Sequence, residues 1–172
     1  MKPMISTPSI EYRPEHPYAA VRIKAPIPFG KYLGPAWSKV NTWLQGQNLT
    51  HGPAIIRYLT TDMSAKLDMD VGFIIDQVLP AGEGILTDVL PAGNYATLLY
   101  TGPYRGKGVY KANVAIMEWA RENGIRWKTS ILDGKEWWES RVEWYFSDPE
   151  SDLDPKDYRT ELTIMLAEQV KK

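Results

Sequence analysis

Two carboxylates stand inside otherwise apolar, strand-like segments: Asp70 in the first half of the chain and Glu161 in the second. Burying an unpaired carboxylate is costly, so each acid needs either solvent or a polar partner. Side chains alternate between the two faces of a strand, which places Glu161 on one face with Thr163 and Met165. The opposite face is uniformly aliphatic and is expected to lie under helices: Leu162, Ile164 and Leu166. We therefore expect Glu161 to face a ligand groove on the side of the sheet away from the helices.

Aromatic side chains accompany these acids. Tyr145 shares a strand face with Glu143, and Tyr58 takes the corresponding position in the first half. Trp137 and Trp138 follow a polar turn in a segment that the first half lacks, so we expect them to wall or cover the groove. Tyr and Trp combine a flat apolar face with a polar tip, and such faces attract cations. The candidate ligand-binding residues are therefore Glu161, Tyr145, Tyr58, Trp138, Trp137, Thr163 and Asp70.

Each acid also has a structural interpretation. A carboxylate on the non-core face of a strand is usually just solvated, and this weighs more for Asp70 than for Glu161. His16 and His51 are far apart and have no carboxylate at ligand spacing, so we expect no metal site. No phosphate-binding or dinucleotide-binding glycine motif occurs, so we expect no cofactor.

The candidate residues recur because the second half of the sequence repeats the pattern of the first half. Asp70 corresponds to Glu161, Tyr58 corresponds to Tyr145, and Tyr18 corresponds to Tyr95. The order of matching residues is kept, and their spacing grows where the second half has extra loop residues. We expect one domain over residues 1–172, built from two repeats at about 9–78 and 85–168 and related by a pseudo-two-fold axis.

Periodicity predicts the elements that position these residues. Apolar residues at helical spacing predict helices over 33–46 and 107–123, the second ended by Gly124. Alternation and β-branched residues predict strands over 9–24, 54–59, 67–76, 85–89, 95–101, 138–147 and 160–167. Each half is then strand-helix-strand-strand. We predict an α+β fold, with an antiparallel sheet backed by two helices and a groove on the other face.

Composition excludes several classes of protein. The 172 residues carry a net charge of −1, with a sequence pI of about 6.1, so there is no electrostatic signature of nucleic-acid binding. The absence of cysteine excludes disulfides and a cysteine nucleophile. No signal peptide or membrane-spanning run is visible. We expect a cytoplasmic protein that binds neither membrane nor DNA.

Four segments resemble the GyrI-like small-molecule-binding family, the effector-binding domain of bacterial multidrug-responsive activators that also occurs as free-standing proteins. These segments are Leu90–Ala96, Tyr100–Tyr104, Val142–Pro149 and Thr160–Ile164. The resemblance covers about residues 9–168. It implies that the last-strand glutamate, here Glu161, meets cationic aromatic ligands, and that Tyr145 is the strand tyrosine of the pocket. Two features depart from the family pattern: the chain lacks a proline shortly after Glu161, and it carries the inserted Trp137-Trp138 pair.

The residues and the resemblance leave two main functions open. The first is a free-standing binder of lipophilic, cationic aromatic molecules, for sequestration or sensing. The second is a hydrolase that opens cyclopropane-bearing toxins with Glu161 as general base, because a carboxyl in an apolar pocket has a raised pKa. Both need the same acid and the same aromatic residues. A protein partner, such as a topoisomerase, is a further alternative from the resemblance.

Overall fold

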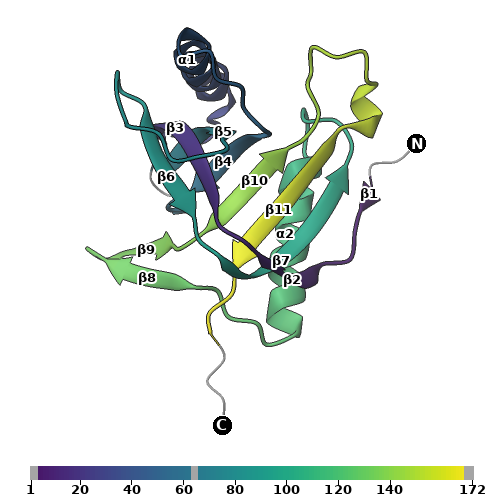
Figure 1. Ribbon diagram of the computed structural model, residues 1–172. Coiled ribbons are helices and arrows are strands. Elements are labelled where there is room, and N and C mark those ends of the chain that lie inside the picture. The colour runs from purple at the N-terminus through teal and green to yellow at the C-terminus, as the bar shows by residue number, and fades with distance from the viewer. Residues whose placement is uncertain (1–3, 63–65, 169–172) are drawn as a thin grey trace.

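The computed structural model describes residues 4–62 and 66–168 and has the predicted α+β architecture (Figure 1). The elements of the first half are β1 (Met4–Ile5), β2 (Ser9–Arg13), β3 (His16–Ala25), α1 (Leu33–Gly46), β4 (Ala54–Tyr58) and β5 (Leu67–Ile74). The elements of the second half are β6 (Leu86–Leu90), β7 (Gly93–Thr101), α2 (Gly108–Glu122), β8 (Thr129–Leu132), β9 (Lys135–Trp138), β10 (Arg141–Tyr145) and β11 (Arg159–Met165). Short 3-10 turns at Gly30–Tyr32 and Pro155–Asp157 complete the order.

One large antiparallel sheet holds the two halves together. Its strands run β1-β7-β11-β10-β4-β5-β3-β6, and β2 also pairs with β7. The central strands β4 and β10 join the halves, and the flanking order is the same on both sides. Tyr18 lies opposite Ile74 across β3 and β5, and Tyr95 lies opposite Met165 across β7 and β11. The residues matched in the sequence thus hold equivalent positions in the two halves, while their origin by duplication stays a prediction.

The helices cover the outer strands of one face. Helix α1 packs on β3 and β5, and α2 packs on β7 and β11 (Figure 1). Residues spaced four apart bury the contact face of each helix: Ala36, Val40 and Leu44 in α1, and Ala112, Ile116 and Ala120 in α2. Burying a Leu, Ile or Val side chain contributes about 1.5–3 kcal/mol, so this stripe, rather than helix propensity, fixes the two helices. Within the described residues, neither helix is long and apolar enough to cross a membrane.

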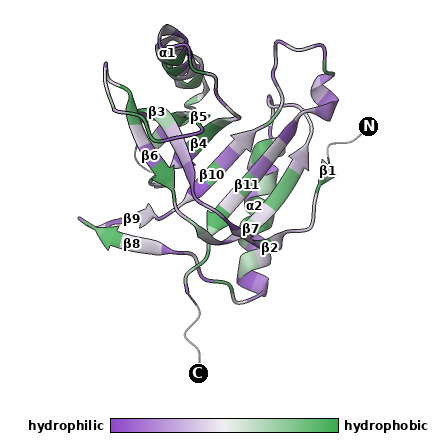
Figure 2. Cartoon of the chain, viewed as in Figure 1, coloured by the Kyte–Doolittle hydropathy of each residue, from purple (hydrophilic) through white to green (hydrophobic). Residues whose placement is uncertain are grey.

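The central strands β4 and β10 lie between the areas that the two helices cover. Cross-strand partners share a face of the sheet, and Glu143 of β10 is paired with Ile56 on one side and with Leu162 on the other. Leu162 packs against the α2 cluster and Ile56 against the α1 cluster, so Glu143 lies on the helix face. Figure 2 shows the alternation of hydrophobic and hydrophilic residues along β11.

The other face of the sheet is not the open groove that we expected. It carries a hydrophobic cluster of its own, formed by Tyr18, Ala20, Ile55, Leu90, Val142 and Trp144. Near this cluster the structure leaves a void of about 10 Å³, roughly the space of one water molecule. The position expected for the groove is therefore corrected: in the described chain, the large cavity lies on the helix face.

A small hairpin, β8–β9, was not predicted as a pair of strands. Asp133 and Gly134 form its two-residue turn, and both have positive φ, at 53° and 76°. A type I′ turn needs such angles at both central positions, and Asp-Gly supplies them. Exposed Ile131 and Leu132 precede the turn, so β8 lacks the in-out alternation that identifies a strand.

Candidate functional site

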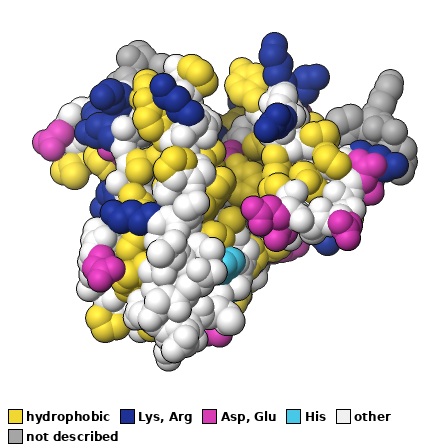
Figure 3. Space-filling view, turned by 90° about the horizontal axis from the view of Figure 1, so that it is seen from above, with side chains coloured by type: hydrophobic (Ala, Val, Ile, Leu, Met, Phe, Trp, Pro, Cys, Tyr) yellow, Lys and Arg dark blue, Asp and Glu magenta, His cyan; other side chains and the backbone are white. Residues whose placement is uncertain are grey.

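A cavity of about 1080 Å³ opens on the helix face above the central strands β4 and β10. Its walls are the β3–α1 connection, the exposed side of α2 and the segment after β4. Most of the lining is apolar or aromatic, including Phe29, Leu33, Val109, Val114, Met117 and Trp127. Figure 3, seen from above, shows hydrophobic side chains gathered around a hollow between two lobes of the molecule. A cavity of this size holds a drug-sized molecule.

A nearly buried carboxylate, Glu143, stands in the wall of this cavity. It is 5% exposed and accepts three hydrogen bonds from side chains. Tyr58 donates to Oε1 over 2.9 Å, and Tyr145 donates to the same oxygen over 2.5 Å. The amide of Asn113 donates to Oε2 over 2.9 Å. These donors stabilise the carboxylate in an apolar surrounding, where an unpaired charge would be strongly unfavourable.

The two tyrosines are fixed by this acid and by their packing. Burial raises the pKa of both Tyr58 and Tyr145 well above the ordinary value, and the charge of Glu143 raises it further. Both hydroxyls therefore stay protonated and act as donors. The Tyr145 ring also makes edge-to-face contacts with Trp37 and Tyr104, at centroid distances of 5.7 and 5.2 Å. The wall around Glu143 is thus aromatic, and hydrogen bonds and ring contacts hold its side chains together.

A cation, Arg141, lies in the same wall two residues before Glu143 on β10. Its Nη2 donates to Asn113 Oδ1 over 3.2 Å, and its guanidinium lies over the ring of Trp138 at 4.5 Å from the centroid. Burial lowers the pKa of Arg141, while the nearby charge of Glu143 raises it. An arginine stays protonated at neutral pH even so. The cavity therefore presents both a negative and a positive group.

Glu161 lies on the face of the sheet away from the cavity. Arg13 of β2 donates from Nη2 to Glu161 Oε2 over 2.7 Å, and the same guanidinium contacts Glu11 at 3.1 Å. The other oxygen of Glu161 is buried and has no hydrogen-bond partner in the described structure. The structure thus places Glu161 beside an arginine rather than in the cavity.

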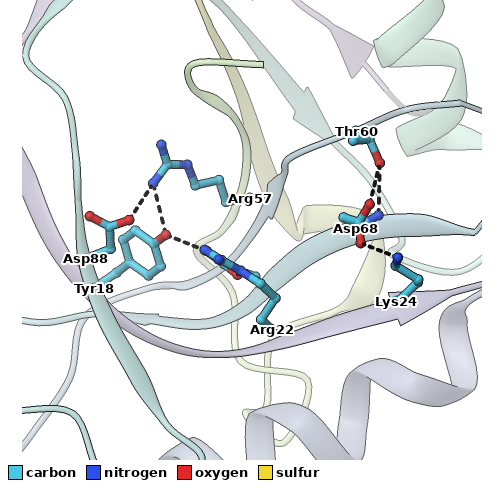
Figure 4. Close-up of polar contacts among 8 residues, drawn as sticks. Tyr18, Arg22, Lys24, Arg57, Thr60, Asp68 and Asp88 are labelled. Carbon is cyan, nitrogen blue, oxygen red and sulfur yellow. Dashed lines mark hydrogen bonds and ion pairs between the residues drawn. The ribbon is translucent and has the colours of Figure 1, made fainter. Parts of the chain in front are cut away.

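Asp70 and Thr163 also lie on that far face. Asp70 is fully buried, accepts from Tyr18 at 2.6 Å and forms two hydrogen bonds with Arg22, at 2.8 and 3.1 Å. Arg57 extends this polar cluster, reaching the Tyr18 hydroxyl at 2.9 Å and Asp88 at 3.6 Å (Figure 4). Thr163 accepts a hydrogen bond of 2.8 Å from the Trp144 indole. Both predicted residues serve internal contacts.

The tryptophan pair does not line the cavity. Trp138 is 7% exposed and belongs to the core cluster under α2, and its indole donates to Thr61 at 2.9 Å. Trp137 donates within its own hairpin, to Leu132 O at 3.3 Å. The expectation that the pair walls or covers the groove is wrong: Trp138 lies in the core, where its ring packs against the guanidinium of Arg141. Of the seven predicted ligand residues, the structure brings Tyr58 and Tyr145 to the cavity.

Three functional candidates were missed by the sequence: Glu143, Arg141 and Asn113. Glu143 shares a strand face with Tyr145 in the sequence, but the repeat and the family resemblance both favoured the last-strand glutamate, Glu161, as the pocket acid. The first half has no acid at the matching position, because Ile56 of β4 corresponds to Glu143, so the repeat did not mark this residue. No cluster of three or more metal-binding side chains occurs in residues 4–62 and 66–168.

The family comparison decides the identity of this domain. The model of the GyrI-like small molecule binding domain matches residues 6–167. The chain belongs to the GyrI-like family. Among curated proteins, none is significantly similar to it in sequence.

Solved structures share the GyrI-like fold at low sequence identity. The EcmrR chain in the EcmrR–DNA complex of EcmrR-RPo superposes with a TM-score of 0.76 at 18% identity, over 94% of this chain and 57% of that chain. This chain thus spans a little over half of the EcmrR chain. The EcmrR C-terminal domain alone gives 0.74 at 18% identity, over 94% and 98% of the two chains.

Two further similar structures carry different names. A hydrolase from Listeria innocua has a TM-score of 0.58 at 13% identity, over 94% of this chain and 92% of that chain. SAV2435, bound to tetraphenylphosphonium, has a TM-score of 0.57 at 10% identity, over 93% of each chain. At these identities the likeness concerns the fold.

Proposed function

We propose that this domain binds lipophilic, cationic aromatic small molecules in the cavity on the helix face. In this proposal Glu143 is the carboxylate that meets the positive charge, taking the role that the sequence had suggested for Glu161. Tyr58 and Tyr145 keep their predicted place beside the ligand. The observation that carries the proposal is the nearly buried Glu143 in the wall of an apolar cavity of about 1080 Å³.

The chemistry of the wall supports such ligands. The carboxylate of Glu143 is largely removed from water, so a cation that reaches it gains more than it would at the surface. Aromatic rings such as Tyr104 and Tyr110 border the cavity and attract cations through their faces. The binding of tetraphenylphosphonium by SAV2435 is in keeping with a lipophilic cation as ligand.

Binding of the fluorescent cation rhodamine 123, measured by fluorescence polarisation, tests the proposal. Glu143→Gln should weaken binding by about 5- to 30-fold, because a partly desolvated charge contact contributes about 1–2 kcal/mol. Glu161→Gln is the matched control, and it should leave the affinity unchanged. A loss in Glu161→Gln with none in Glu143→Gln would move the site to the other face of the sheet and refute the proposal.

Hydrolysis is the second candidate function, and the fixed carboxylate of Glu143 favours it. Tyr58 and Tyr145 take both lone pairs of Oε1, whereas Asn113 takes only one of Oε2, so Oε2 keeps a lone pair that could accept a proton from water. A screen of electrophilic cyclopropyl compounds tests this function. Turnover should fall by about 10²–10⁴-fold in Glu143→Gln. If wild-type protein consumes no compound at high concentration, the domain is a binder alone.

A further inference from the structure

We infer that Arg141 is a specificity-determining residue of the cavity and binds a carboxylate of the ligand. The preferred ligands are then aromatic molecules that carry both a positive and a negative group, rather than simple cations. This inference rests on the proposed function, because it concerns the same cavity.

The guanidinium of Arg141 has unused donors. Arginine has five N–H groups, and the hydrogen bond that Arg141 makes with a described side chain runs from Nη2 to Asn113. In residues 4–62 and 66–168, its Nε and Nη1 have no hydrogen-bond partner. Neither atom is among the buried polar atoms that lack a partner, so both are accessible from outside the protein. Since Arg141 lines the cavity, these donors are open to a molecule that enters it.

No acid of the described chain pairs with Arg141. Its guanidinium has no carboxylate within 4.0 Å among those residues, although burial makes an unpaired charge unfavourable. Glu143 lies nearby, but Asn113 stands between the two charges: its Oδ1 accepts from Arg141, and its Nδ2 donates to Glu143. A carboxylate on the ligand would supply the partner that Arg141 lacks.

Packing holds Arg141 in place before a ligand arrives. One face of its guanidinium lies against the Trp138 ring, and Trp138 is itself fixed by its hydrogen bond to Thr61. Stacking on a ring leaves the edge of the guanidinium, which carries the N–H groups, free for polar partners. A preorganised arginine of this kind favours carboxylates, because the planar fork matches their two oxygens.

The two charges are spaced for one ligand. Arg141 and Glu143 are two residues apart on β10 and share a face, so their backbones lie roughly 7 Å apart, given a rise of about 3.3 Å per residue. Simple cations would gain from Glu143 but meet the repulsion of Arg141. A zwitterionic aromatic molecule satisfies both groups.

A pair of dyes that differ in one group tests the inference. Rhodamine 110 carries a free carboxylate, and rhodamine 123 is its methyl ester, which has lost that charge. Wild-type protein should bind rhodamine 110 about tenfold more tightly, as expected for a charged, hydrogen-bonded contact. Arg141→Gln should abolish this preference: the affinity for rhodamine 110 should fall, while the affinity for rhodamine 123 should stay the same or rise. Arg141→Lys, which keeps the charge without the fork, should retain part of the preference.

Several outcomes would overturn the inference. Equal affinity of wild-type protein for the two dyes would do so without any variant, so poor folding of Arg141→Gln cannot obscure the result. An equal loss of affinity for both dyes in a folded Arg141→Gln variant would also overturn it. Unchanged affinity for both dyes in Glu143→Gln would refute the role proposed for Glu143 alone, because the comparison of acid and ester would still report on Arg141. Absence of binding by either dye would overturn both proposals.

Discussion

Replacing Tyr145 by phenylalanine should destabilise the protein through Glu143. The substitution removes the hydroxyl that donates to Glu143 Oε1 over 2.5 Å. It keeps the ring and so preserves the edge-to-face contacts with Trp37 and Tyr104. The carboxylate would retain its bonds from Tyr58 and Asn113, so it would not become an unpaired buried charge.

The magnitude follows from this remaining support. A hydrogen bond to a charged group contributes about 1.5–3 kcal/mol, and the lower end applies because two donors stay in place. We expect the free energy of unfolding to fall by about 1.5–2 kcal/mol. For a protein of 172 residues this corresponds to a decrease in Tm of roughly 3–8 °C.

Urea unfolding in two backgrounds isolates the hydrogen bond. In the Glu143→Leu background the hydroxyl has lost its acceptor, so Tyr145→Phe should cost almost nothing there. The difference between the two backgrounds is the coupling energy of the pair. Tyr110→Phe, at a residue that is 62% exposed, is the control and should leave stability unchanged. The same loss in both backgrounds would show that the hydroxyl does not act through Glu143.

Two further predictions concern the sheet and the response to alkali. Gly72→Ala should lower the free energy of unfolding by more than about 3 kcal/mol or prevent folding, because the new Cβ would lie 1.8 Å from Ala19 O and the β3 backbone would have to shift. Gly46→Ala is the control and should be neutral or stabilising, because nothing lies within 4 Å of its new Cβ. Similar urea midpoints for the two variants would contradict this reasoning. The pKa of Tyr58 and that of Tyr145 are raised in the folded state, so the folded protein binds more protons than the unfolded chain above pH ~10. The contribution of the two tyrosines to stability is therefore fully present below about pH 10, and above it the free energy of unfolding should fall by about 1.4 kcal/mol per pH unit for each tyrosine. If the double variant Tyr58→Phe/Tyr145→Phe loses stability equally steeply in alkali, this assignment is refuted.

Local pattern was enough for the helices and for most strands. The buried stripes of α1 and α2 depend on residues three to four apart, which a single segment of sequence contains. Family membership was likewise visible in short motifs, and the family model confirms it. The matching of Tyr18 with Tyr95 agrees with the register of both halves. In each case the information lies within one element or in the order of elements along the chain.

The identity of the cavity acid required tertiary structure. Alternation along β11 correctly separated Glu161 from Leu162, but alternation says nothing about which face of β10 joins which face of β11. Register across the strands places Glu143 beside Leu162, on the face that the sequence had assigned to the core. That face holds both core and cavity, because α1 and α2 cover the outer strands and leave β4 and β10 between them.

The sequence by itself determined the α+β fold, the two helices and the presence of strand tyrosines beside an acid. The tertiary structure decided which acid that is, and it brought Arg141 and Asn113 to the same wall. It also turned Asp70 into the centre of a buried polar cluster with Tyr18 and Arg22. The physical reason is that periodicity is written into neighbouring residues, whereas a site arises from side chains whose meeting depends on strand register and on where each helix lies across the sheet.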